Sequence, residues 1–300
     1  MSDGAITAEF LSRTPLLQPA DDGDKDQRGR VMVIAGSLTV PGAALLAATA
    51  ALRAGAGKLQ IATCQSIAIQ LGLAVPEALV LGLPETRSGE IDPSAALLLR
   101  ERTTRCDAVL IGPGMIDEEA AAALTANVLD CDPGAAFVLD AGALGKLKDL
   151  AAVLGRHNGQ MVITPHAGEM ANLLSIDKHD ILRNPAEVAA KTASLLNCVV
   201  ALKGSCTYIA APGGGAWTYN DGNIGLATSG SGDTLAGIIA GLLARGVTPL
   251  QAAQWGVYLH GEAGNRLAQS RGPLGFLARE LLAEIPVIMA AFRRTGSRAQ

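Results

Sequence analysis

A glycine-rich loop that leads into an apolar helix is the feature of this sequence with the clearest chemical meaning. It runs from Asn223 to Gly237 and reads NIGLATSGSGDTLAG. Gly230, Ser231 and Gly232 have small side chains, so their backbone N–H groups can converge on a phosphoryl oxygen, and the positive end of the helix dipole adds to the attraction. These three residues are therefore predicted to form an anion hole.

Asp233 follows the anion hole and needs a different role, because a carboxylate repels phosphate. It can accept the proton of a hydroxyl group that attacks phosphorus, which predicts a catalytic base. The helix dipole is expected to favour its ionised form. The alternative is that Ser231 or Asp233 only caps the helix, as these residue types often do. Further glycines at Gly222, Gly225 and Gly237 favour the anion site, since a cap requires a single residue.

The segment ALKGSCT, residues 201–207, combines a cation with a flexible backbone directly after an apolar run. Lys203 offers a point charge to phosphate, and Gly204 allows the backbone to approach a ligand closely. An ordinary turn is the alternative. The segment lacks the GxxxxGK[ST] pattern, so no Walker-type nucleotide site is predicted.

The segment VITPHAGEM, residues 162–170, places a histidine and a carboxylate after another apolar run. Thr164 is predicted to cap the following helix, with Pro165 at its first position. A single histidine is usually structural, but His166 and Glu169 suit a ligand contact beside a water-bridged Mg²⁺.

Two more glycine-rich turns follow apolar runs, at Ile34–Ala43 (IAGSLTVPGA) and Leu110–Met115 (LIGPGM). The first does not match the GxGxxG fingerprint, and no acidic residue follows the next strand at the expected distance, which argues against a Rossmann dinucleotide site. The second allows close approach of a ligand or forms a tight turn.

Short apolar runs alternate with Ala- and Leu-rich helical segments through most of the chain. Strands are predicted at 31–35, 59–63, 108–111, 137–139, 161–163 and 199–202, and helices at 43–53, 118–129, 185–196, 234–244, 249–268 and 277–291. This pattern predicts an α/β fold with a central, mainly parallel sheet flanked by helices on both faces. Residues 208–211 and 216–219, separated by PGGG, predict a hairpin. Ligands of such sheets bind at the carboxyl ends of the strands, which would gather the motifs above.

Composition limits the function classes. The 300 residues are 49% hydrophobic, which suits a single domain over 1–300, with 1–29 and 294–300 at its periphery. A net charge of -4 and an aromatic content of 3% argue against nucleic acid as a partner. No secretory signal and no apolar stretch of membrane-spanning length are present in the sequence, so we expect a cytoplasmic protein that does not bind membranes. The 5 cysteines form no CxxC pair, which predicts neither a zinc site nor a disulfide framework.

In their order along the chain, the motifs resemble those of the ADP- or ATP-dependent (S)-NAD(P)H-hydrate dehydratases of the ribokinase-like superfamily. The matching segments are GSLTVPGAALLAATAALRAGAG, GPGM, VLDAGAL, TPHAGEM, LKGSCT, GLATSGSGDTLAG and YLHGEAG, between about residues 30 and 268. The resemblance implies a ribokinase-like fold and a carbon–oxygen lyase that repairs hydrated NADH or NADPH, with ADP or ATP as co-substrate and Mg²⁺. It also implies phosphorylation of the ring hydroxyl and loss of phosphate, a better leaving group than hydroxide.

The resemblance also implies roles for individual residues. Asp233 matches the catalytic base. The positions expected to contact the hydrated dinucleotide are Ala43, Gly114, His166 and Asp233. The positions that match the nucleotide-binding residues are Lys203, Gly204, Ser205, Cys206, Thr207 and Gly232. Glu169 stands in HAGE where many sugar and vitamin kinases have NxxE, so any Mg²⁺ contact is expected through water.

The chain departs from the family pattern at Gly142, where DADAL is usual, and at Ser229, where glycine is usual; neither change affects Asp233. The resemblance implies a homo-oligomer, with a tetramer among the assemblies it allows. Many relatives carry an amino-terminal epimerase domain; we expect none in this chain, and we expect a separate epimerase instead. Two alternatives remain: a ribokinase-like kinase of a small alcohol or vitamin precursor, which HAGEM and the GSLTVPGAALLA segment disfavour, and a non-catalytic nucleotide-binding regulator.

Overall fold

A ten-stranded sheet runs through the computed structural model, which describes residues 4–17, 24–131 and 134–296. Its strands are β1 (Gly4–Ala5), β2 (Arg30–Ile34), β3 (Lys58–Cys64), β4 (Ala78–Leu83), β5 (Ala108–Ile111), β6 (Ala136–Leu139), β7 (Met161–Ile163), β8 (Val199–Leu202), β9 (Thr207–Ala210) and β10 (Ala216–Tyr219). Their order is β1-β10-β9-β8-β7-β6-β5-β2-β3-β4. Strands β2 to β8 run parallel, whereas β9 and β10 form an antiparallel hairpin beside β8.

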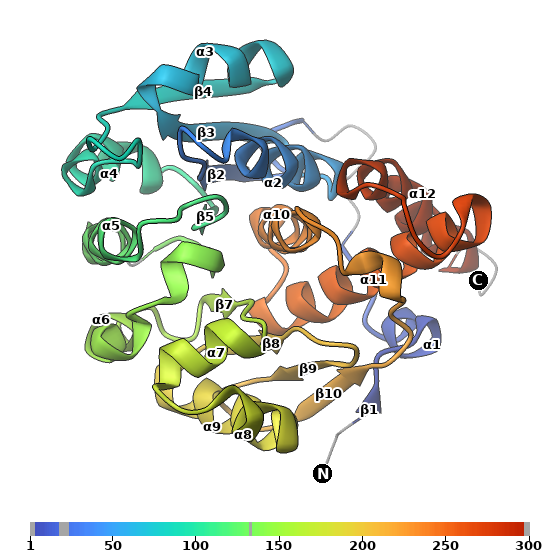
Figure 1. Ribbon diagram of the computed structural model, residues 1–300. Helices are drawn as coiled ribbons and strands as arrows, with labels where there is room; N and C mark the ends of the chain where they lie inside the picture. The colour runs from blue at the N-terminus through green and yellow to red at the C-terminus, as the bar shows by residue number, and fades with distance from the viewer. Residues whose placement is uncertain (1–3, 18–23, 132–133, 297–300) are drawn as a thin grey trace.

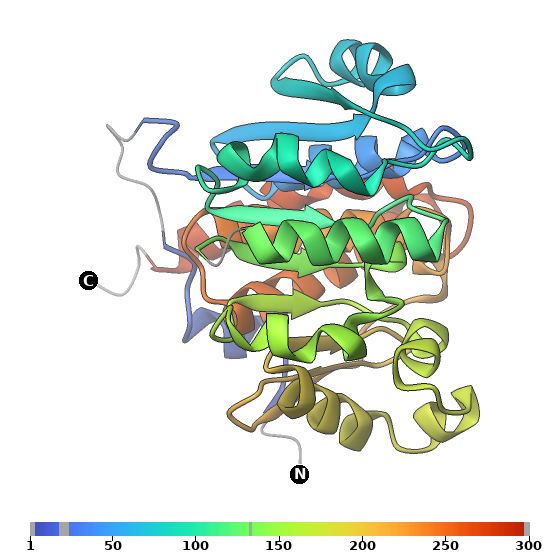
Figure 2. The same ribbon diagram turned by 90° about the vertical axis from the view of Figure 1, so that its left-hand side faces the viewer.

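Helices cover both faces of the sheet. The α-helices are α1 (Ala8–Ser12), α2 (Pro41–Arg53), α3 (Gln65–Ala74), α4 (Ala96–Thr103), α5 (Glu118–Cys131), α6 (Ala151–Gly155), α7 (Ala167–Leu174), α8 (Lys178–Arg183), α9 (Pro185–Leu196), α10 (Ser231–Ala244), α11 (Pro249–Arg271) and α12 (Ala278–Gly296). Short 3₁₀ helices are η1 (Pro93–Ala95), η2 (Ala141–Leu144), η3 (Leu147–Leu150) and η4 (Ile224–Leu226). Helices α2, α10, α11 and α12 lie on one side of the sheet (Figure 1), and α4, α5 and α6 lie on the side that faces the viewer in Figure 2.

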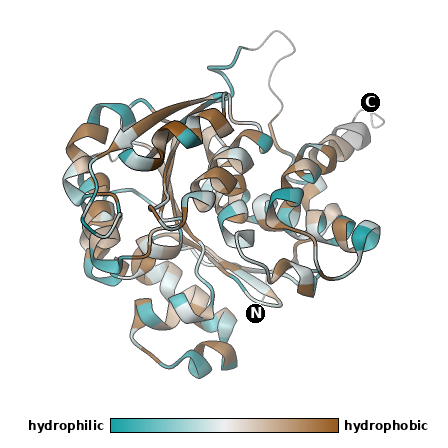
Figure 3. Cartoon of the chain, turned by 45° about the horizontal axis from the view of Figure 1, so that its top comes forward, coloured by the Kyte–Doolittle hydropathy of each residue, from teal (hydrophilic) through white to brown (hydrophobic). Residues whose placement is uncertain are grey.

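The central strands form the core. Every side chain of β5 and β8 is buried, as expected for parallel strands covered on both faces. The strands of the sheet are largely brown in Figure 3, whereas hydrophilic colour lies mainly on the outer helices and loops. The sheet is therefore a fixed platform for the loops that leave its carboxyl ends.

Helix α10 packs unusually closely on α2. A Cβ atom at Gly237 would collide with the carbonyl oxygen of Ala47, and one at Gly241 would collide with that of Ala51. Glycine is required at both positions because the backbone of α2 occupies the space of a side chain. The amino-terminal ends of the two helices are thereby held side by side.

Most sequence expectations for the fold are confirmed. Strands β5, β7 and β8 and helix α9 have the predicted bounds, and the predicted hairpin is β9–β10. The sequence reading did not identify β4 or α3. Residues 4–17 are not wholly peripheral as expected, because β1 pairs with β10 at the edge of the sheet and Ile6, Leu11 and Leu16 are buried, although most of the other residues of this segment are exposed. Residues 1–3, 18–23 and 297–300 of the expected peripheral segments lie outside the described residues.

All five cysteines lie in the described part of the chain, and each is a free thiol. No helix within the described ranges is long and apolar enough to cross a membrane.

Candidate active site

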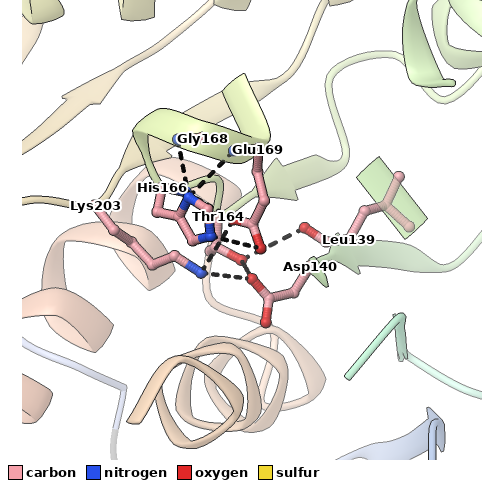
Figure 4. Close-up of polar contacts among 7 residues, drawn as sticks. All are labelled: Leu139, Asp140, Thr164, His166, Gly168, Glu169 and Lys203. Atoms are coloured by element: carbon pink, nitrogen blue, oxygen red, sulfur yellow. Dashed lines mark hydrogen bonds and ion pairs between the residues drawn. The ribbon is translucent and has the colours of Figure 1, made fainter. Parts of the chain in front are cut away.

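Three adjacent parallel strands deliver polar residues to one point at the edge of the sheet. Strands β6, β7 and β8 are followed by Asp140, Thr164 and Lys203. The Lys203 ammonium donates to Asp140 Oδ1 at 2.8 Å, and the Thr164 hydroxyl donates to the same oxygen at 2.7 Å (Figure 4). Asp140 is 2% exposed, so this carboxylate depends on its two donors in place of water.

Lys203 lies among several carboxylates. Its Nζ is 2.8 Å from Asp140 Oδ1 and 3.7 Å from Glu169 Oε2. Burial acts to lower the pKa of Lys203, but the charges of Asp140 and Glu169 outweigh it, so its pKa is raised. The ammonium therefore keeps its positive charge beside the amino-terminal end of α10, where a Cβ on Gly232 would lie 3.3 Å from Nζ.

His166, rather than Thr164, caps the helix that follows β7. His166 Nδ1 accepts from the N–H groups of Gly168 at 3.0 Å and Glu169 at 3.1 Å, and Glu169 Oε2 accepts from the N–H of His166 at 2.7 Å. This reciprocal pair is a capping box. The prediction for Thr164 was wrong because its hydroxyl bonds to Asp140, an interaction between residues far apart in sequence, and Pro165 precedes the helix.

The amino-terminal end of α10 has the geometry of an anion hole. Its N-cap is Gly230, in the left-handed conformation with φ of 82°, and no side chain caps the helix. The capping alternative for Ser231 and Asp233 is therefore wrong. The N–H of Ser231 donates to the carbonyl of Thr228 at 3.2 Å, whereas those of Gly232 and Asp233 have no protein acceptor among the described residues. Two free backbone donors thus remain for an anion.

The side chain of Asp233 is held in an environment that disfavours its charge. Burial, together with the negative charge of Asp140, raises the pKa of Asp233 to about 6, although Lys203 acts in the opposite direction. The expectation that the helix dipole would dominate was wrong, because burial and the neighbouring carboxylates outweigh it. A carboxylate with this pKa is a stronger base than an ordinary aspartate and is still ionised at neutral pH.

A cavity of about 650 Å³ opens beside the anion hole. Predicted residues that line it are His166, Lys203, Gly204, Ser205, Thr207, Ser231 and Gly232. Its apolar wall includes Ile224, Leu226, Leu235 and Val257. This volume and mixture of apolar and polar walls suit a nucleotide-sized ligand.

The loop between β8 and β9 is tied down at its far end. Cys206 does not line the cavity, and its thiol donates to Asn220 Oδ1 at 2.7 Å, which connects the loop to the end of β10. Burial raises the pKa of the Cys206 thiol, so this residue anchors the loop as a neutral group. A Cβ on Gly204 would lie 3.0 Å from the carbonyl oxygen of Cys206, which leaves little room for a side chain.

Ala43 and Gly114 meet in a second corner of the site. A Cβ on Gly114 would lie 2.7 Å from the Cβ of Ala43, and the N–H of Gly36 donates to the carbonyl of Pro113 at 2.7 Å. Neither residue is among those that line the cavity. The corner is next to the anion hole, since a Cβ on Gly230 would collide with Leu46 of α2.

The departure at Gly142 has a steric explanation in this chain. A Cβ at this position would lie 2.6 Å from the carbonyl oxygen of Met115, so the aspartate usual in the family would require the two loops to move apart. Nothing in the structure explains the serine at position 229.

Sequence reasoning gave no role to two residues of the site, Asp140 and His260. Asp140 sits directly after a predicted strand, and the rule that ligands bind at strand ends could have identified it. His260 is within the YLHGEAG segment but reaches Ser231 only through the packing of α11 on α10, with 2.9 Å between Nε2 and Oγ. No local pattern predicts that contact.

The donor set suits a cation held mainly by a bound nucleotide. No cluster of three or more His, Cys, Asp or Glu side chains arranged for a metal occurs in the described ranges. Mg²⁺ commonly keeps several waters and binds substrate phosphates together with one or two carboxylates. Glu169, with a side chain 21% exposed and close to Lys203, fits a contact through water.

Comparisons with known proteins show what this chain is similar to. The family model described as NAD(P)H-hydrate dehydratase matches residues 31–287. The chain is 50% identical over 284 residues to the ADP-dependent (S)-NAD(P)H-hydrate dehydratase of Xanthomonas campestris pv. campestris, covering 95% of each chain.

Solved structures give the same result. The ADP/ATP-dependent NAD(P)H-hydrate dehydratase from Bacillus subtilis, co-crystallized with ATP and Mg²⁺, aligns with a TM-score of 0.80 and 29% identity over 96% of this chain and 98% of that one. A ribokinase-like superfamily protein from Enterococcus faecalis aligns with a TM-score of 0.79 and 26% identity over 96% of each chain. The ribokinase-like fold predicted from the sequence is confirmed.

Proposed function

The chain belongs to the NAD(P)H-hydrate dehydratase family, and from that premise we propose that it converts (S)-NAD(P)H-hydrate to NAD(P)H with ADP or ATP as co-substrate. The observation that carries the proposal is the position of Asp233. It follows Gly232, which lines the nucleotide-sized cavity, and it lies in the first turn of α10. Helix α10 packs on α2, and α2 begins beside the Ala43–Gly114 corner. A base between the nucleotide cavity and the Ala43–Gly114 corner can take the proton of a substrate hydroxyl as that hydroxyl attacks a phosphoryl group of the nucleotide.

The first step is phosphoryl transfer. The hydroxyl oxygen on the hydrated ring attacks the terminal phosphorus of the nucleotide, the bond from that phosphorus to its bridging oxygen breaks, and ADP leaves as AMP or ATP as ADP. Asp233 orients the hydroxyl and takes its proton. The N–H groups of Gly232 and Asp233 and the ammonium of Lys203 are placed to stabilise charge on the phosphoryl oxygens.

The second step is loss of phosphate from the ring. The carbon–oxygen bond breaks with its electron pair leaving on phosphate, and loss of a ring proton restores the dihydronicotinamide double bond. Phosphate leaves where hydroxide would not, so one nucleotide is consumed for each NAD(P)H formed. Glu169 would hold Mg²⁺ through water, together with the nucleotide phosphates, and the cation would supply positive charge to neutralise the phosphate.

Separate binding regions are proposed for the two substrates. Lys203 to Thr207 and Gly232 bind the nucleotide, supported by the cavity that most of these residues line. Ala43, Gly114 and His166 are proposed to contact the hydrated dinucleotide. The Ala43–Gly114 contact next to the anion hole supports the first two, whereas His166 lines the cavity proposed for the nucleotide.

The test is direct. Purified protein is incubated with hydrated NADH and either ADP or ATP in the presence of Mg²⁺, and the return of dihydronicotinamide absorbance is followed. Phosphate and AMP or ADP should appear in equal amounts with NADH. Rapid phosphorylation of a simple alcohol, with hydrated NADH untouched by either nucleotide, would establish the kinase alternative. Nucleotide binding without any turnover would establish the regulator.

A further inference from the structure

His260 contacts the hydroxyl of Ser231 at the anion hole. Its Nε2 lies 2.9 Å from Ser231 Oγ, and both residues line the cavity. Ser231 is 5% exposed and lies in the first turn of α10, whereas His260 belongs to α11, which packs along α10. The hydrogen bond therefore connects an imidazole to the anion hole across a helix interface.

The direction of this hydrogen bond decides what the serine hydroxyl can do. Burial lowers the pKa of His260 to about 4, so the ring is neutral at neutral pH and carries one N–H. If Nε2 carries the hydrogen, it donates to Oγ and leaves the serine O–H free to donate elsewhere. If Nδ1 carries it, the serine O–H is used on Nε2 and no longer faces the cavity.

The anion hole has fewer free backbone N–H donors than a terminal phosphoryl group has non-bridging oxygens. The N–H of Ser231 is used by the carbonyl of Thr228, and those of Gly232 and Asp233 are free among the described residues. A terminal phosphoryl group has three non-bridging oxygens, so two backbone donors do not match all of them. The Ser231 hydroxyl lies in the same helical turn and can supply a third donor.

We propose that His260 is a positioning residue that donates its Nε2–H to Ser231 Oγ, so that the serine hydroxyl donates to the terminal phosphoryl group of the nucleotide. This inference rests on the proposed function and deepens it. The neutral imidazole fixes the direction of a dipole without adding a charge, which Lys203 already supplies. No bond to carbon or phosphorus involves either residue.

Calorimetric binding of ADP and of AMP separates this role from general packing, because AMP lacks the terminal phosphoryl group of ADP. Ser231→Ala is expected to weaken ADP binding about tenfold and leave AMP binding unchanged, with kcat reduced on the order of 10²-fold, the scale for one lost oxyanion donor. His260→Leu should give the same pattern. His260→Gln, whose side-chain amide can replace the Nε2–H donor, should recover most of the ADP affinity.

The double variant tests whether the two residues act as one unit. Ser231→Ala with His260→Leu should be no worse than Ser231→Ala alone, because both changes remove the same hydrogen bond to phosphate. Gln254→Met is the matched control, since Gln254 is buried in the same helix and is not among the residues that line the cavity. It should leave the ratio of ADP to AMP affinity unchanged.

Three results would overturn the proposal: normal ADP affinity in His260→Leu, a double variant whose loss equals the product of the single losses, or the same selective loss in Gln254→Met. The binding measurements require no turnover. If the variants behave as expected while the unaltered protein fails to dehydrate hydrated NADH, the proposed function is wrong and the role of His260 stands.

Discussion

Replacing Asp233 by asparagine is expected to make the protein more stable and far less active. Folding raises the pKa of Asp233 from 3.8 to about 6, first through burial. The folded state therefore holds the proton more tightly than the unfolded state, so the contribution to stability is greatest below pH 3.8 and falls as the pH rises to about 6. At 1.36 kcal/mol per pK unit, the ionised carboxylate costs about 3 kcal/mol at pH 8.

An asparagine side chain does not carry this cost. With an unfolding entropy of about 2.1 cal/mol/K per residue, a gain of about 3 kcal/mol in a chain of this length corresponds to an increase of about 5 °C in Tm at pH 8. At pH 5 the gain should be about half as large, because the native carboxyl group is then mostly protonated. Differential scanning calorimetry at the two pH values measures both quantities.

Turnover should change in the opposite direction. Asp233→Asn removes the base and should lower kcat on the order of 10²-fold or more while ADP affinity is retained. In the unaltered protein, kcat/KM should fall as the pH drops below about 6, because the carboxylate is the active form.

A true helix cap provides the control for this experiment. Asp177 Oδ1 accepts from the N–H of His179 at the start of α8, so Asp177→Ala should lose about 1 kcal/mol of stability with turnover unchanged. If Asp233→Asn behaves in this way instead, with lower stability at pH 8 and near-normal turnover per folded molecule, the catalytic role must be abandoned.

Three further substitutions probe the neighbouring groups. Gly204→Val should weaken ADP binding about tenfold in calorimetry, since a Cβ at this position lies 3.0 Å from the carbonyl oxygen of Cys206. Gly213→Val is the control, because a Cβ there has no neighbour within 4 Å, and equal ADP affinities in the two variants would exclude the loop between β8 and β9 from the nucleotide site. Asp140→Asn should lower the free energy of unfolding in urea by about 3 kcal/mol, because the Lys203 ammonium loses the carboxylate 2.8 Å away. It should also move the acid limb of the kcat/KM profile below pH 6, because the charge of Asp140 helps to raise the pKa of Asp233; an unchanged limb would contradict this coupling. Glu169→Gln should raise the Mg²⁺ concentration for half-maximal activity about tenfold. Its Tm should be unchanged, since the glutamine amide oxygen can still accept from the His166 N–H, and an unaltered Mg²⁺ requirement would limit the role of Glu169 to the capping box.

The sequence predicted those features that depend on neighbours along the chain. Strands β5, β7 and β8 are short apolar runs, each of which follows a helix, and their predicted bounds match the structure. The edge strand β4 was missed although its sequence, ALVLGL, is an apolar run, so this signal was present in the sequence and was not used. Its hydrogen-bonding partner in the sheet is β3, which runs parallel to it.

The candidate site shows the same limit. The anion hole and the Lys203 loop could be identified from local spacing and from the resemblance to a family. The interactions that tune them could not, because they join residues far apart in sequence: Thr164 and Lys203 with Asp140, and Ser231 with His260. The pKa of Asp233 depends on burial that only the assembled fold creates, so a rule for an isolated helix gave the wrong sign.

The close glycine contacts between α10 and α2 allow residues outside the active site to determine how the catalytic base is aligned with the substrate. Gly237 lies one helical turn beyond Asp233, and its contact partner Ala47 lies one turn beyond Ala43, so the helix interface sets the spacing between the base and the substrate corner. A methyl group added at Gly237 would push the helices apart, and a misplacement of about 1 Å can reduce a rate on the order of 10²-fold. In a mutational scan, substitutions at this buried interface should therefore look like active-site lesions even where the variants remain folded.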